Sequence, residues 1–152
     1  MFKMKLHTAI VLASIVISAE AQDNLEEINK EIRILSAYHG LDPLPPRATR
    51  LCGLPPANGQ DGMPVTFSVQ INSVSISADA FAVETSSGNI ITPLCATLRP
   101  ALEPLELRTI LLIGSFSAGD SFPLSVEVVG ELEDVDGNSL IGLKAEKVTP
   151  LE

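Results

Sequence analysis

An alternation of apolar and polar residues that begins at Val65 constrains the fold more than any other feature. Val65, Phe67, Val69 and Ile71 are separated by single polar residues, the pattern of a β-strand with one buried face. The pattern returns further along the chain. It predicts a mostly β protein, an antiparallel β-sandwich over residues 65–152.

Turn signals and apolar runs divide this region into six or seven short strands. Ser86-Ser87-Gly88-Asn89 and Asp136-Gly137 are typical turn sequences. The expected strands between such signals lie at 81–85, 90–98, 106–116, 124–128 and 140–148. Pro93 indicates an edge or a bulge. The run at 106–116 also fits a helix, but its β-branched residues and Gly114 favour a central strand.

A short amphipathic helix is expected over 22–40. Leu25, Ile28, Ile32 and Leu35 recur at spacings of three and four, which places them on one helical face. Gly40 is a suitable C-cap. A proline-rich linker is expected over 41–64, because six prolines there deny ladder hydrogen bonds to a sheet.

Residues 1–21 have the three parts of a secretory signal peptide. Lys3 and Lys5 precede an apolar run over 9–19 that ends in Ala19-Glu20-Ala21. The alternative is an uncleaved anchor, although about 20 apolar residues are needed to span a bilayer. We expect a secreted or periplasmic chain of 131 residues, with no membrane span after cleavage.

Charge and cysteine content narrow the partners and the compartment. Loss of Lys3, Lys5 and Glu20 changes the formal charge from −9 to −10, which disfavours nucleic acid as a partner. Export would place Cys52 and Cys95 where disulfides persist, so a pair is expected. The alternative is two free thiols, with Cys95 buried.

Two stretches resemble a known family. They read VTFS at 65–68 with SADAFAV at 77–83, and VEVVG at 126–130 with DVDGNSL at 134–140. They are similar to bacterial Ig-like domains of surface-layer and cell-surface proteins. The resemblance implies an Ig-like β-sandwich and no particular activity. The helix, the linker and the cysteines are not part of the family's pattern.

Acidic residues cluster at 131–138. Asp134, Asp136 and Asn138 alternate as in the opening of a calcium loop, since calcium prefers carboxylate, amide and carbonyl oxygens. The downstream glutamate of an EF-hand is missing. The alternative is a solvated hairpin in which Asp, Gly and Asn serve the geometry of the turn. We expect no cofactor, with calcium at this cluster as the alternative.

Other chemistry has less support. A copper site would join His39 to Met63, and glycoside chemistry would pair Glu103 with Glu106. The sequence has no G-x-S-x-G motif, and we expect no catalytic residues. The resulting hypothesis is that the chain is an exported, non-catalytic Ig-like domain. Its role would be structural, or it would bind an envelope or extracellular protein. A calcium-binding envelope protein and a small secreted hydrolase are the alternatives.

Overall fold

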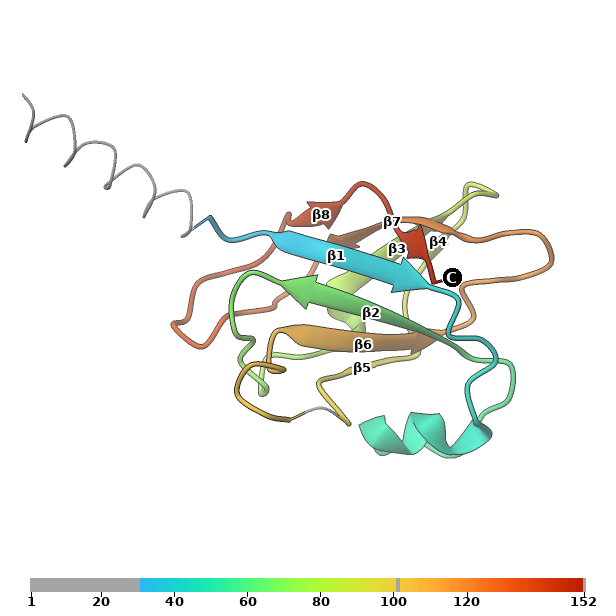
Figure 1. Ribbon diagram of the computed structural model, residues 1–152, viewed down its shortest axis with the longest axis horizontal. Helices are drawn as coiled ribbons and strands as arrows, with labels where there is room; N and C mark the ends of the chain where they lie inside the picture. Colours follow the sequence, from blue (N-terminus) through green and yellow to red (C-terminus); the bar gives the residue numbers. More distant parts are fainter. Residues whose placement is uncertain (1–30, 101, 152) are drawn as a thin grey trace, which may run out of the picture. The chain divides into compact units, whose positions relative to one another are not determined.

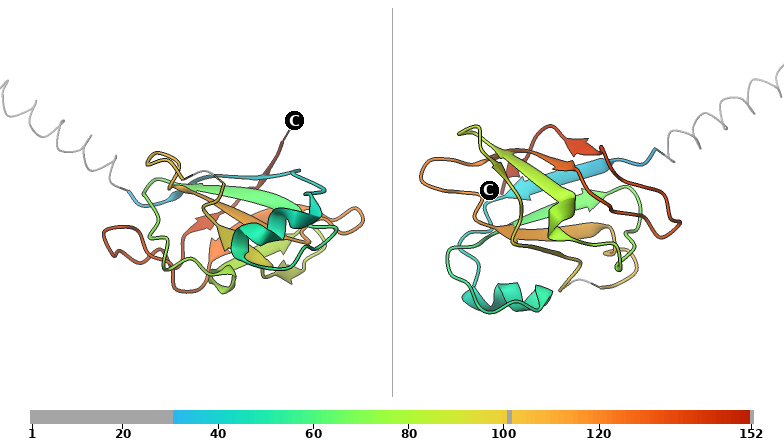
Figure 2. Two further views of the ribbon diagram at one scale, coloured as in Figure 1. Left: turned by 90° about the horizontal axis from the view of Figure 1, so that it is seen from below. Right: turned by 180° about the vertical axis from the view of Figure 1, so that it is seen from behind.

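Residues 31–100 and 102–151 are described by a computed structural model of the chain. The predicted signal peptide, and the predicted helix as far as residue 30, lie outside this range. Contacts divide the chain into Met1–Glu31 and Ile32–Glu152. The second unit is a β-sandwich of two sheets, which confirms the predicted fold class. In Figure 1 the first sheet faces the viewer, and the second faces the viewer in the right-hand view of Figure 2.

The first sheet has five strands in the order β5-β6-β2-β1-β9. Its neighbours are antiparallel except β1 and β9, which are parallel. The bounds are β1 Ile34–His39, β2 Asp61–Phe67, β5 Cys95–Thr97, β6 Thr109–Gly114 and β9 Thr149–Pro150.

The second sheet has four antiparallel strands in the order β4-β3-β7-β8. Two short 3-10 helices lie in the connections. The bounds are β3 Phe81–Thr85, β4 Ile90–Ile91, β7 Pro123–Val128, β8 Lys144–Ala145, η1 Pro46–Cys52 and η2 Ala78–Ala80. Among the described residues, no helix has the length and apolar character needed to cross a membrane.

The core lies between the sheets, and most of its strand residues belong to the alternating patterns predicted from the sequence. Two residues differ from the prediction: Met63 lies in the predicted linker but is buried, and Leu124 begins the expected strand 124–128 but is 41% exposed. Both sheets contribute fully buried side chains: Met63, Val65, Phe67, Phe81, Val83, Ile110, Leu112, Val126 and Val128. Burial of each such side chain stabilises the fold by about 1.5–3 kcal/mol relative to exposure. The run at 106–116 contains a strand, β6, which is central because β5 and β2 flank it.

The predicted helix over 22–40 is wrong at its C-terminal end, where residues 34–39 form strand β1. Ala37 is 2% exposed and lies opposite Val65 in β2. The helical spacing of Ile32 and Leu35 is local, whereas the pairing of β1 with β2 joins distant residues and prevails. Gly40, with φ of 107°, follows a strand and does not cap a helix.

The predicted linker over 41–64 is also wrong, because most of it is folded onto the sandwich. Its prolines include Pro46, which starts η1, and Pro64, which lies inside β2. Proline suits a first helical position, where no N–H partner is needed. The sandwich therefore begins at β1, before residue 65. Figure 1 shows η1 beside β5.

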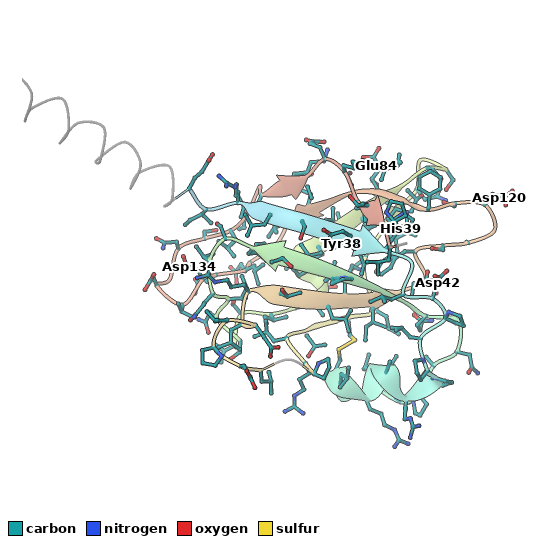
Figure 3. All side chains as sticks on the ribbon, viewed as in Figure 1. Tyr38, His39, Asp42, Glu84, Asp120 and Asp134 are labelled. Carbon is teal, nitrogen blue, oxygen red and sulfur yellow. A yellow bond between two sulfur atoms is a disulfide. The ribbon has the colours of Figure 1, made fainter. Side chains whose placement is uncertain are left out.

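The predicted disulfide is confirmed between Cys52, at the end of η1, and Cys95 in β5. The two Cα atoms are 6.1 Å apart, and the bond is visible in Figure 3. Cys95 pairs with Ile113, and the neighbouring Ala96 pairs with the core residue Leu112. Because side chains alternate across a strand, Cys95 and Ile113 point away from the core. Both are nevertheless buried.

The expected strand at 90–98 is two strands. β4 belongs to the second sheet and β5 to the first, so the chain changes sheets around Pro93. Proline removes a ladder hydrogen bond, so it suits a crossing between sheet edges. The expected return strand at 140–148 is shorter than predicted, since only Lys144–Ala145 within it forms a strand.

Candidate functional site

The predicted calcium loop is a tight turn organised around one carboxylate. Asp134 is 1% exposed. Its Oδ1 accepts hydrogen bonds from the backbone N–H groups of Asp136 at 2.9 Å and Asn138 at 2.8 Å. Its Oδ2 accepts one from the Asn138 side-chain amide at 2.8 Å. Glu133 and Ser139 pair across the turn, so the predicted hairpin is present.

These hydrogen bonds govern the ionisation of Asp134. Burial raises the pKa of the carboxyl group, but the hydrogen bonds from Asn138 and Asp136 outweigh it and lower the pKa below 3.8. The carboxylate is thus held in its charged form by the protein's own donors. Asp136 and Asn138 have exposed side chains. Calcium binding at Asp134, Asp136 and Asn138 stays a prediction.

The other predicted pairs lie in different surroundings. Met63 is fully buried in the core, whereas His39 lines a surface groove, and copper binding by this pair stays a prediction. The Glu106 carboxylate accepts a hydrogen bond from the backbone N–H of Glu103 at 3.1 Å, a local turn contact. Both cysteines are in the disulfide. Neither cysteine therefore offers a free thiol.

A groove of about 570 Å³ opens at the end of β1. We call it the His39 groove. Its walls come from the ends of β1 and β9, from β3 and β7, and from the segment after β8. They include His39, Glu84, Phe122, Leu124, Ser125, Glu146 and Lys147. Figure 3 shows His39 and Glu84 toward the same end of the sandwich, and Asp134 toward the opposite end.

Two rings form one wall of the groove. The His39 and Phe122 rings are stacked with centroids 5.9 Å apart and an angle of 18° between their planes. Phe122 is 45% exposed and Leu124 is 41% exposed, so large apolar surfaces face solvent there. This wall offers flat, apolar contact area to a ligand.

Acidic residues lie in the groove and on the sheet face beside it. Glu84 lies directly across from Ser125 on the neighbouring strand, and the Ser125 hydroxyl donates a hydrogen bond of 3.0 Å to its Oε2. Glu127 pairs with Lys144 in β8. Because Val83 and Val126 point into the core, these polar side chains lie on the outer face of the second sheet.

The charges on this face are coupled. Lys144 Nζ lies 3.0 Å from Glu146 Oε2. That hydrogen bond and the charge of Glu146 raise the pKa of Lys144, and the charges of Glu84 and Glu127 raise it further. The face therefore favours positive charge. Of the residues that line this groove, only His39 was a predicted ligand, because the others are far apart in the chain.

The chain matches no protein-family model, no curated protein and no solved structure. The fold and the geometry of the groove therefore carry the functional argument alone.

Proposed function

We propose that the chain is an exported, non-catalytic Ig-like module that acts by binding a partner protein at the cell envelope or outside the cell. The observation that carries the proposal is the strand order. Ig domains place strands A, B, E and D in one sheet and C, F and G in the other, with C′ joining the second in some types. The orders β1-β2-β6-β5 and β4-β3-β7-β8 correspond to A-B-E-D and C′-C-F-G.

Three features differ from the Ig pattern. The first sheet has a fifth strand, β9, which is parallel to β1 and lies beyond the four strands of A-B-E-D. The disulfide of antibody domains joins strands B and F across the sheets, whereas Cys52–Cys95 joins η1 to the strand in the D position. The chain also has no tryptophan, which antibody domains bury beside their disulfide. These differences distinguish the chain from antibody domains, and the cysteines are not part of the surface-protein pattern either.

Export is supported by two observations. The first 21 residues have the pattern of a signal peptide. A disulfide persists in oxidising compartments, and Cys52–Cys95 is such a link. Binding is supported by the His39 groove, which presents exposed apolar side chains beside charged ones.

One experiment tests export and binding together. The full chain is expressed in a bacterial host with an envelope, and the mature protein is recovered from the periplasm or medium after chemical crosslinking. Mass spectrometry should find an N-terminus at Gln22 and a crosslinked partner of one identity. An intact Met1 in the cytoplasm would contradict export. Recovery of the protein alone, in its native host as well, would contradict binding.

A further inference from the structure

We infer that the His39 groove receives a protein segment that carries an arginine side chain flanked by apolar residues. This inference rests on the proposed partner-binding function and names the site and the chemistry of the partner. The observations behind it are the stacked rings of His39 and Phe122, the Glu84 carboxylate and the exposed apolar surface between them.

The groove is held in shape by backbone hydrogen bonds from several segments. The backbone N–H of Leu151 donates to the His39 carbonyl at 2.8 Å. Phe122 and Ser86 are joined twice: the Ser86 N–H donates to the Phe122 carbonyl at 2.8 Å, and the Phe122 N–H donates to Ser86 Oγ at 3.1 Å. A preformed wall lowers the entropy cost of binding.

The Glu84 carboxylate has capacity for a further donor. Oε2 accepts the Ser125 hydroxyl, and within the described part of the chain no hydrogen bond reaches Oε1. A guanidinium group is planar and always charged, it pairs with carboxylates through two N–H groups, and it stacks on aromatic faces. A groove with an aromatic wall and a carboxylate wall matches both properties of arginine.

The charges around the groove favour an arginine-containing segment over an anionic ligand. Glu84, Glu146 and Lys147 line the groove, the charges of Glu84 and Glu127 also act on the neighbouring Lys144, and the whole chain carries a formal charge of −9. An anionic ligand would be repelled by this balance. The exposed surfaces of Phe122 and Leu124 would stay in water if the ligand were a free cation alone. A segment with apolar residues on both sides of the arginine covers them.

The test is an NMR titration of the purified, disulfide-bonded protein with short blocked peptides. The probes are acetyl-Leu-Arg-Leu-amide and, as the matched neutral control, acetyl-Leu-Gln-Leu-amide. We expect the arginine probe to shift the signals of His39, Glu84 and Phe122, and to bind at least fivefold more tightly than the glutamine probe. Equal affinities, or shifts confined to other regions, would overturn the inference.

Variants make the test specific. Glu84→Gln keeps an acceptor for the Ser125 hydroxyl and should weaken the arginine probe at least fivefold. Phe122→Leu keeps an apolar side chain but removes the ring, and should weaken it at least threefold. Glu103→Gln, an exposed carboxylate outside the groove, should leave the affinity unchanged. Unchanged binding by a folded Glu84→Gln protein would count decisively against the inference.

A second copy of the chain is the competing occupant. If the groove signals shift on dilution of the free protein, the groove is a self-association surface and the inference is wrong. The proposed partner-binding function and the inference about the groove can be contradicted by different results. A partner that crosslinks through another face, with no peptide binding, overturns the inference alone. Peptide binding in the groove without any captured partner overturns the proposed function.

Discussion

Cys95 and Ile113 lie directly opposite each other on β5 and β6, and both are buried although they point away from the core. The Cys52–Cys95 bond brings the end of η1 to this position. The segment that contains η1 therefore covers a small second apolar cluster on the outside of the first sheet.

Removal of the disulfide should lower the free energy of unfolding by about 4 kcal/mol, because the link closes a long loop in the unfolded chain. The loop has a sequence separation of 43. Urea unfolding of Cys52→Ser/Cys95→Ser, followed by circular dichroism, measures the loss. Wild-type protein treated with a reductant is the control and should unfold at the same midpoint. A variant as stable as the oxidised wild type would refute this prediction.

Ile113→Ala should destabilise the oxidised protein by about 2–5 kcal/mol, since it leaves a cavity at a fully buried site. The loss should be smaller in the Cys52→Ser/Cys95→Ser background, where η1 is no longer fastened over Ile113. Urea unfolding of the four proteins gives the coupling energy. Val83→Ala, at a fully buried position of the second sheet, is the control and should lose the same stability in both backgrounds. If the losses of stability from the two changes simply add, Ile113 and the disulfide do not stabilise the fold together, and the prediction is wrong.

Asp134→Asn should reduce stability at neutral pH by about 1.5–3 kcal/mol, because the charged acceptor of three hydrogen bonds is lost. The folded-state pKa of Asp134 lies below 3.8. Its contribution is therefore complete above the unfolded value and is lost as the pH falls through the folded one.

The measurement is urea unfolding of wild type and Asp134→Asn between pH 7 and pH 2.5. The difference between them should shrink below pH 3.8. Asp136→Asn changes an exposed carboxylate of the same turn, and its effect should stay within about 0.5 kcal/mol. A gap of constant size across this range would show that the charge of Asp134 does not stabilise the turn.

Asp61→Ala should destabilise the fold by about 1.5–3 kcal/mol. Its buried carboxylate accepts the backbone N–H groups of Phe116 at 2.9 Å and Ser117 at 2.7 Å, which fixes the loop after β6. Asp61→Asn keeps a carbonyl acceptor and should cost less. Amide hydrogen exchange should accelerate at Phe116 and Ser117 in the alanine variant. Unaltered exchange at both amides would argue against this role.

The sequence predicted the parts of the fold that depend on local alternation. Val65 and Phe67 identify β2, and the apolar run around Leu112 identifies β6, because a half-buried strand carries its own signal. β1 was missed because Ile32 and Leu35 also fit a helix, and its strand form depends on pairing with Val65. Pro46 marked the start of η1 but stood among prolines typical of a linker.

The candidate sites divide in the same way. The disulfide followed from a count of cysteines, and the turn at Asp134 from Asp-Gly at 136–137. The His39 groove could not be predicted from the sequence, because Glu84, Phe122 and Lys147 come together only when both sheets are formed. No local spacing relates a residue at the end of β1 to one that follows β8.

The parallel pairing of β1 with β9 has a consequence for how the chain reaches its fold. Tyr38 pairs with Thr149, so β1 obtains its outer neighbour from a strand more than 100 residues further along the chain. Loop closure over such a distance must precede the contact, and folds dominated by non-local pairs form in milliseconds to seconds. The β1 edge of the first sheet therefore stays open until β9 joins it, late in the folding of the sandwich.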